Sequence, residues 1–307
     1  MNGVAVAFAI IIVTISVGYL AARIGLIAVE QGRLLNRLAF YIFSPALLFS
    51  VLAKTSVKTL FSPVLLVLLL SGVVIAVLFV FTSRLLFRRT LRETAMGVGA
   101  SMYLNSNNIG LPISLFVLGD LTYFAPVLVL HLVVLTPVLL VVLELGSSVR
   151  APVARTLGKA FSNPLIVAAL LGMLVAFTQT QLPAVVFEPL SALGTAAVPL
   201  LLFAYGVSLR GQRVFHADGD RPFALTAILL KSAVMPIVAF MLSAWVFHLN
   251  AHQIFVAVVL AALPTAQNMF TYASVYNAKL YAVRDIVFTT TLVSLPVILL
   301  ITALLKA

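Results

Sequence analysis

The sequence contains no cysteine and very little charge. Without cysteine the chain has no disulfide, no thiolate metal site and no cysteine nucleophile. Only 9% of its 307 residues are charged, whereas a soluble domain has about 25%. By contrast, 63% of the residues are hydrophobic, which is more apolar surface than an aqueous fold of this size can bury. The composition therefore predicts a polytopic membrane protein, and the long continuous apolar runs predict that it is all-helical.

Sequence motifs of enzymes and of primary pumps are also missing. The chain has no His-Glu-x-x-His, no Gly-x-Ser-x-Gly and no Walker-type phosphate-binding loop. Its Asp and Glu residues number 8 in total, too few within apolar segments for acid–base catalysis. We therefore expect neither an enzyme nor a bound cofactor or metal ion.

Ten apolar segments have the length, about 17–25 residues, that a helix needs to cross the hydrocarbon core of a bilayer. They are residues 4–22, 34–53, 63–84, 95–118, 123–145, 164–180, 190–209, 222–247, 252–276 and 284–305. The sequence thus predicts ten transmembrane helices in contact with the lipid bilayer.

The basic residues are distributed unequally between the two sides of these spans. The connections after the odd-numbered spans contain 15 of the 19 Lys and Arg residues, whereas the opposite side has Lys54, Lys58 and Lys306. The positive-inside rule places the basic side in the cytoplasm, so both termini face outward across the cell (inner or plasma) membrane. This pattern also accounts for the net charge of +11 without a nucleic-acid partner.

Two of the spans contain polar, helix-breaking segments. Residues 105–112 read Asn-Ser-Asn-Asn-Ile-Gly-Leu-Pro, and residues 263–268 read Leu-Pro-Thr-Ala-Gln-Asn. A free backbone N–H or C=O costs several kcal/mol, roughly, in hydrocarbon, so a spanning helix is broken only where it lines a cavity or a binding site. Two breaks in corresponding positions of two halves are typical of a transporter's substrate site.

Proline-containing motifs recur in the same order in the two halves. Pro45, Pro63, Pro112 and Pro137 have counterparts 154, 159, 152 and 159 residues later, at Pro199, Pro222, Pro264 and Pro296. This order predicts a duplicated five-helix unit, with residues 1–145 and 164–307 as the repeats and 146–163 as a cytoplasmic connection. Because five is odd, the second repeat is inverted in the membrane.

The motif Asn105-x-x-Asn108-x-Gly110-Leu111-Pro112 resembles the fourth span of the auxin efflux carrier family, which includes plant auxin exporters and bacterial organic-acid or malonate permeases. The resemblance extends over nearly the whole chain. It implies the fold of bile-acid sodium symporters, in which helices 1, 2, 6 and 7 form a scaffold. Helices 3–5 and 8–10 then form a mobile transport domain, with helices 4 and 9 broken and crossing. It further implies an elevator-type alternating-access cycle and a homodimer formed through helices 2 and 7.

The candidate substrate-binding residues lie at the two breaks. Neutral amides can bind a carboxylate and release it again, and the N-terminal ends of half-helices favour an anion. We expect amide contacts from Asn105, Asn108, Gln267 and Asn268, possible oxygen ligands from Thr265, and a wall from Ser44. Gly110, Pro112 and Pro264 are expected to shape the breaks. The alternative is that the amides only satisfy the broken backbone.

Two further polar residues lie deep inside spans. Lys231 either neutralises an anionic substrate or titrates during the cycle, or else it replaces a coupling cation by tying together the ends of helices 4 and 9. His131 is interpreted either as a proton relay or, more simply, as a hydrogen-bonded packing residue.

The sequence therefore predicts a secondary transporter of a small organic anion, a mono- or dicarboxylate resembling auxin or malonate. One alternative is a sodium-coupled symporter of a bile-acid-like or other organic anion. A sodium site needs clustered oxygen ligands, and no carboxylate accompanies Thr265, Gln267 and Asn268 in the sequence. Another alternative is a membrane sensor that does not transport.

Overall fold

The computed structural model describes residues 2–55, 62–87, 89–146, 163–210 and 220–305. This part of the chain is all-helical and contains no strand, only one isolated β-bridge. The predicted connection at 146–163 falls almost entirely outside the described residues. The chain divides into two compact units. Unit 1 comprises Met1–Phe61, Asn107–Val129 and Phe161–Arg213, and unit 2 comprises Ser62–Ser106, Leu130–Ala160 and Val214–Ala307.

Unit 1 is built mainly from the helices of the first, second, sixth and seventh predicted spans. These are α1 (Asn2–Arg23), α2 (Val29–Leu38), α3 (Ser44–Lys54), α11 (Pro164–Thr178), α12 (Ala184–Thr195) and α13 (Ala197–Ser208), with the π-helical turn η1 (Ala39–Phe43) joining α2 to α3. The unit also contains α7 (Leu111–Ile113), η4 (Ser114–Leu118) and most of η3 (Ser106–Gly110) and α8 (Phe124–Leu130).

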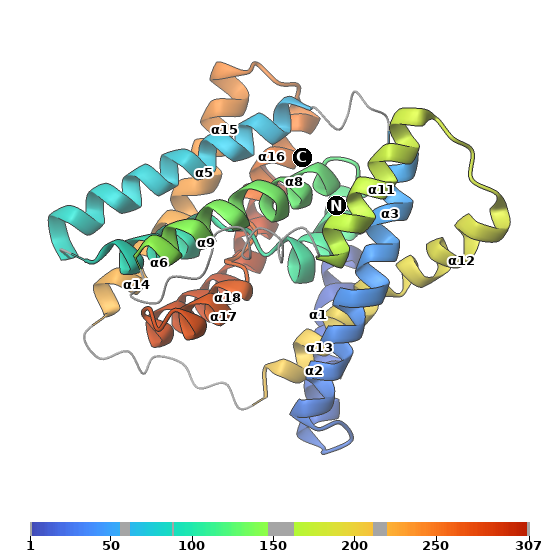
Figure 1. Cartoon of the computed structure of the whole chain (residues 1–307), viewed down its shortest axis with the longest axis horizontal. Coiled ribbons are helices and arrows are strands. Elements are labelled where there is room, and N and C mark those ends of the chain that lie inside the picture. Colours follow the sequence, from blue (N-terminus) through green and yellow to red (C-terminus); the bar gives the residue numbers. More distant parts are fainter. Residues whose placement is uncertain (1, 56–61, 88, 147–162, 211–219, 306–307) are drawn as a thin grey trace. The chain divides into compact units, whose positions relative to one another are not determined.

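Helices α1 and α13 of unit 1 lie side by side at very close range (Figure 1). Glycine permits this approach from both sides, as small residues do between membrane helices. A Cβ atom at Gly18 would lie 2.2 Å from the carbonyl oxygen of Phe203, and one at Gly206 would lie 2.0 Å from that of Ile15. Any larger side chain at either glycine would force the two backbones apart.

Unit 2 contains the remaining helices. They are α5 (Pro63–Thr82), η2 (Ser83–Phe87), α6 (Leu91–Met102), η5 (His131–Leu135), α9 (Thr136–Leu145), α14 (Arg221–Leu229), η6 (Leu230–Val234), α15 (Met235–Met241), η7 (Leu242–Val246), α16 (Ala251–Ala261), α17 (Asn268–Val275) and α18 (Leu280–Leu305). Its core is a cluster of buried side chains from α6, α9, α17 and α18, including Met96, Leu143, Met269 and Val283. The cluster joins helices from both halves of the sequence.

Within the described ranges, six helical stretches are long and apolar enough to cross a membrane. They are Glu30–Lys54, Pro63–Leu86, Phe124–Leu145, Ala184–Ser208, Arg221–Val246 and Leu280–Leu305. Four shorter apolar helices are Ala9–Arg23, Asn108–Leu118, Pro164–Thr178 and Ala251–Ala261. Each of these stretches overlaps one predicted span. Two of the shorter ones belong to the spans for which a break was predicted.

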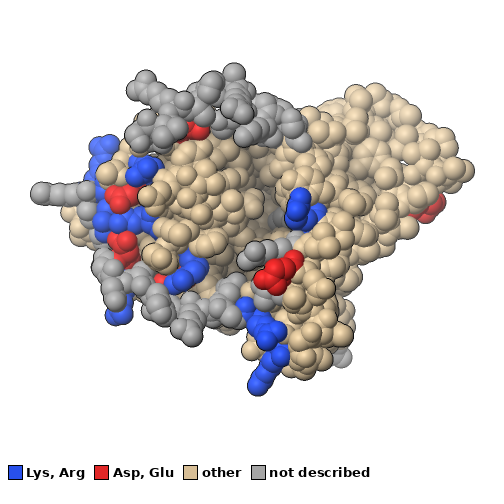
Figure 2. Space-filling view, turned by 60° about the horizontal axis from the view of Figure 1, so that its bottom comes forward, with Lys and Arg blue, Asp and Glu red and all other residues tan. Residues whose placement is uncertain are grey.

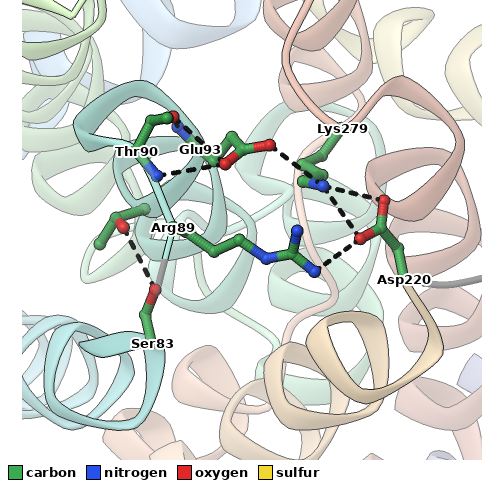
Figure 3. Close-up of polar contacts among 7 residues, drawn as sticks. Ser83, Arg89, Thr90, Glu93, Asp220 and Lys279 are labelled. Carbon is green, nitrogen blue, oxygen red and sulfur yellow. Dashed lines mark hydrogen bonds and ion pairs between the residues drawn. The ribbon is translucent and has the colours of Figure 1, made fainter. Parts of the chain in front are cut away.

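Charged side chains of both signs gather at one end of unit 2, toward the left of Figure 2, while most of the visible surface is uncharged. Lys279 lies between two carboxylates, with its Nζ 2.9 Å from Asp220 and 3.0 Å from Glu93 (Figure 3). Arg89 approaches Asp220 from the other side, with Nη2 2.9 Å from Oδ1. We call Arg89, Glu93, Asp220 and Lys279 the charged cluster. It links the start of α6 to the residues just before α14 and α18.

Glu93 has a second role at the start of α6. Its carboxylate accepts a hydrogen bond from the backbone N–H of Thr90, and the Thr90 hydroxyl accepts one from the Glu93 N–H, which together form a capping box. Partial burial raises the pKa of the Glu93 carboxyl. The bonds from Lys279 and Thr90 outweigh this effect, so that its pKa lies below the ordinary value.

Candidate functional site

The first predicted break is present but shorter than expected. Helix α6 ends at Met102, and Tyr103 adopts an extended conformation with φ −77° and ψ 120°. Helical backbone resumes at Ser106. The interruption is therefore Tyr103–Asn105, two residues earlier than the predicted start.

Gly110 and Pro112 lie inside the resumed helix, so the expectation that they shape the break was wrong in position. Gly110 has ordinary helical angles, φ −64° and ψ −43°. Pro112 follows the π-helical turn η3 at the start of α7. A proline lacks a backbone N–H, and a π-type turn is a place where the helical hydrogen-bond ladder changes register, so the helix continues through it.

The second break lies where the sequence predicts it. Helix α16 ends at Ala261 and helix α17 begins at Asn268, leaving residues 262–267 outside the helices. Pro264 lies in the middle of this segment and is buried. Because proline has no N–H to donate, only its carbonyl needs a partner.

The two interruptions are bonded to each other within unit 2. The N–H of Asn105 donates to the carbonyl of Pro264 at 2.8 Å, and the N–H of Ala266 donates to the carbonyl of Tyr103 at 3.1 Å. These bonds form an antiparallel bridge between Leu104 and Thr265. They satisfy backbone groups that an interrupted helix would otherwise leave bare in hydrocarbon.

Thr265 joins this bridge to two helices, through its side chain and through its backbone N–H. Its hydroxyl donates to the carbonyl of Ala100 on α6 at 2.6 Å. Its backbone N–H donates to the hydroxyl of Thr290 on α18 at 3.1 Å. Thr265 is fully buried. The role of Thr290 was not predicted, although a run of three threonines at 289–291 within an apolar helix was a signal for it.

The amide residues of unit 2 lie next to the bridge in the sequence, just after each of the two residues that it pairs. Asn105 is part of it and is only 3% exposed. Gln267 is half-buried at the N-cap of α17, without a capping hydrogen bond from its side chain. Asn268 is exposed in the first turn of α17. The N-terminal end of α17 and the amide groups form the kind of surface that binds a carboxylate.

Four predicted site residues belong to unit 1. Ser44 is fully buried at the start of α3, and its Oγ has no hydrogen-bond partner among the described residues. Asn108, Gly110 and Pro112 are buried in the helical stretch from η3 to η4. Within unit 1 this stretch contacts α1 and α13.

Lys231 lies in η6, and its side chain reaches the C-terminal end of α16. It is completely buried, and its Nζ donates to the carbonyl oxygen of Ala261 at 2.8 Å, with the sulfur of Met235 at 3.3 Å. Ala261 is the last residue of α16, where the helix dipole is negative and favours a cation. Of the interpretations given for Lys231, this contact agrees with the one in which the lysine replaces a coupling cation, at the end of the first half of helix 9.

His131 packs against the residue that opens the first interruption. Its ring meets the Tyr103 ring edge-on, with centroids 4.9 Å apart. The Tyr103 hydroxyl donates to the His131 carbonyl at 3.1 Å and is also hydrogen-bonded to Thr136. These contacts anchor Tyr103 to η5 and α9. Tyr103 and Thr136 were not identified from the sequence.

A resident metal ion has no evident ligand set in the described ranges. No group of three His, Asp or Glu side chains in them is arranged to hold one. The bridge, the amides and the buried lysine are thus the polar features on which a small-molecule site would be built.

The family model for membrane transport proteins matches the chain over residues 4–152 and 147–302. The chain belongs to this family. It is the auxin efflux carrier family that the Asn-x-x-Asn-x-Gly-Leu-Pro motif predicts, and it consists of transporters rather than enzymes. Together with its apolar helices, this makes the protein a multi-pass membrane transporter.

Two relatives of this auxin efflux carrier family member match nearly its full length. A Rhizobium meliloti (strain 1021) protein named "Putative malonate transporter" is 27% identical over 296 residues, covering 91% of this chain and 89% of its own. A Methanocaldococcus jannaschii protein named "Uncharacterized transporter" is 24% identical over 301 residues, covering 95% of each chain.

Proposed function

We propose that the protein is a secondary transporter that moves a small organic anion, a mono- or dicarboxylate, and binds it beside the two bonded interruptions. The observation that carries this proposal is the pair of hydrogen bonds between Asn105 and Pro264 and between Ala266 and Tyr103. Interrupted helices that meet deep in a transporter are where substrates bind. The proposed substrate contacts within unit 2 are Asn105, Gln267 and Asn268. Asn108 and Ser44 belong to unit 1 and stay predictions from the sequence.

The proposed architecture is ten transmembrane helices in two inverted repeats. The antiparallel sense of the Leu104–Thr265 bridge supports it, because equivalent segments of inverted repeats run in opposite directions where they meet. The positions of Pro63 and Pro222 agree as well, since each lies in the first turn of its helix, α5 or α14. Both termini are proposed to face outward across the plasma membrane.

An elevator-type cycle is proposed, with helices 1, 2, 6 and 7 as the scaffold. The contents of the two units support it, since α1, α2, α3, α11, α12 and α13 all fall in unit 1, and α5, α6, α9 and α14–α18 fall in unit 2. In this proposal helices 3–5 and 8–10 move with the substrate, and two copies of the chain pair through helices 2 and 7 of the scaffold. The units do not match this division completely, because residues Asn107–Val129, from helices 4 and 5, fall in unit 1.

Malonate is the substrate to be tested first, because a relative with 27% identity is named for it. Monocarboxylates are the matched second set, since the amides and the end of α17 bring no full charge. Transport without sodium is proposed. The hydrogen bond from Lys231 to Ala261 supports this, because the ammonium group already occupies the negative end of α16.

The test is uptake of radiolabelled carboxylates into proteoliposomes. We expect Asn105→Ala to abolish uptake while the protein remains folded, because it removes an amide at the bridge. Gln181→Ala is the matched control, because it removes an exposed side-chain amide from the segment between α11 and α12 and should transport normally. Normal uptake by the Asn105 variant would refute the site, and the absence of uptake of any carboxylate by the wild type would refute the substrate class.

A further inference from the structure

Unit 2 contains a groove between α5, α6 and α9, three helices that lie side by side in Figure 1. Its volume is about 250 Å³. Each helix contributes to its walls: Ala76 and Val80 from α5, Val98 and Met102 from α6, and Val138 and Val142 from α9. Small-molecule sites that enclose a whole ligand have about 300–1,000 Å³, so this groove holds only part of a larger molecule.

The walls of the groove offer nothing to an anion. The polar groups among its lining residues are already bonded elsewhere: the Thr94 hydroxyl lies 3.1 Å from that of Ser83, and the Tyr103 hydroxyl is bonded at His131 and Thr136. A carboxylate placed there would lose its hydration without replacement. The groove is therefore not the carboxylate site but a site for a hydrocarbon chain.

The dimensions of the groove match one leaflet of a bilayer. Its lining runs along α6 from Leu91 to Tyr103. At 1.5 Å per residue this is about 18 Å, and one leaflet contributes about 15 Å of hydrocarbon. Val138 at its rim is 56% exposed, so the groove opens on an apolar surface.

Basic residues follow at the Leu91 end of the groove. Arg84 is exposed and lies four residues after Val80 of the α5 wall, in η2. Arg92 adjoins Leu91 and packs against the α9 wall, where a Cβ at Gly146 would lie 3.0 Å from the Arg92 Cβ. The Nε of Arg92 is buried without a hydrogen-bond partner among the described residues. Two of the three walls thus end in an arginine.

We propose that this groove binds one acyl chain of an anionic phospholipid, whose phosphate lies beside Arg84 and Arg92. The apolar walls fit the chain, and the arginines complement the headgroup charge. The acyl chain packs along the whole of α6, the half-helix that ends at the bridge between Leu104 and Thr265. The lipid is thus a structural ligand of unit 2 and not the transported anion.

The test uses full-length protein in detergent, washed free of lipid and then titrated with phosphatidylglycerol, with retained lipid measured by native mass spectrometry. Ala76→Phe fills the groove and should retain about ten-fold less phosphatidylglycerol, equivalent to about 1.4 kcal/mol. Val77→Phe is the matched control, because it places the same ring on the next, outward-facing residue of α5 and should retain as much lipid as the wild type. Equal retention by the two variants would overturn the proposal.

The headgroup is tested separately. Arg84→Gln combined with Arg92→Gln should remove the preference for phosphatidylglycerol over phosphatidylcholine, and an unchanged preference would overturn the assignment of the arginines. Inorganic phosphate at the same concentration should not raise the unfolding temperature of the wild type as phosphatidylglycerol does. Equal protection by phosphate would overturn the role of the acyl chain. None of these measurements involves transport, so they stand apart from the carboxylate proposal.

Discussion

At the scale of single residues, Thr265 has the clearest structural role. The last carbonyls of a helix have no intrahelical partner, and the Ala100 carbonyl near the end of α6 receives its hydrogen bond from the Thr265 hydroxyl. That bond crosses between the two halves of the sequence. A methyl group of the same size in place of the hydroxyl would leave the carbonyl buried without a donor.

We therefore expect Thr265→Val to destabilise the protein by about 1–3 kcal/mol, the cost of one unsatisfied buried group. Thr302→Val is the matched control, because the Thr302 hydroxyl donates to the Ile298 carbonyl of its own helix, which also accepts the helical N–H. Thermal unfolding in detergent measures both. An equal loss of stability in the two variants would contradict the role assigned to Thr265.

Lys231 gives a second prediction. Lys231→Met keeps the length of the side chain but removes the ammonium group, so the Ala261 carbonyl at the end of α16 loses the hydrogen bond that Lys231 donates to it. We expect the free energy of unfolding to fall by about 1–3 kcal/mol, which thermal unfolding in detergent detects as a lower unfolding temperature. Lys54→Met, which removes a lysine that lies over the Phe187 ring 4.3 Å from its centroid, should cost less. A Lys231 variant as stable as the wild type would show that the ammonium group is dispensable for the fold.

The sequence identified some of these residues and missed others for physical reasons. Asn105, Thr265 and Lys231 are polar residues in apolar spans, where each needs a partner, so composition alone marks them. Tyr103 and Thr136 are ordinary in such spans, and only the fold brings their side chains together. Thr290 is missed for the same reason, since its contact with Thr265 joins residues 25 apart.

At the scale of helices, the charged cluster fixes the ends of three segments in unit 2. Lys279 contacts Glu93 and Asp220, and Arg89 contacts Asp220, so four side chains link the starts of α6, α14 and α18 (Figure 3). Networks of this kind hold geometry better than isolated surface pairs do.

The cluster predicts a dependence of stability on pH. The folded-state pKa of Glu93 is below its ordinary value of 4.5, so its contribution is complete above pH 4.5 and is lost as the pH falls through the lower folded value. As the pH falls below 4.5, the unfolding temperature of the wild type should therefore decrease more steeply than that of the Glu93→Gln variant. Unfolding curves recorded across this range measure the difference, and parallel curves would contradict it.

Helix boundaries show what periodicity and proline signals can and cannot locate. The predicted bounds of the second break, 263–268, differ by one residue from the observed segment, 262–267. The prediction is accurate because Pro264 lies inside the break. The first was placed too late, because Gly110 and Pro112 were interpreted as breakers, whereas the π-helical turn at Ser106–Gly110 lets the helix pass through them. Hydrophobic patterns do not distinguish a π-type turn from a break.

At the scale of the whole molecule, the assignment to the auxin efflux carrier family leads to a prediction about ion coupling. If the Lys231 ammonium takes the place of a cation at the end of α16, replacing sodium by choline should leave the initial rate of carboxylate uptake unchanged. Thermal stabilisation by carboxylates, measured with and without sodium, checks the same point at the level of binding. A sodium-dependent rate or shift would favour the symporter alternative.

The bridge between the interruptions has a mechanical consequence for the whole protein. Separating α6 from α16 would break two backbone hydrogen bonds. It would leave two N–H and two C=O groups without partners in the hydrocarbon of the bilayer. A pore that opens by separating these half-helices would therefore carry a high energetic cost. In the elevator-type cycle proposed above, the paired half-helices would stay joined while they carry the substrate.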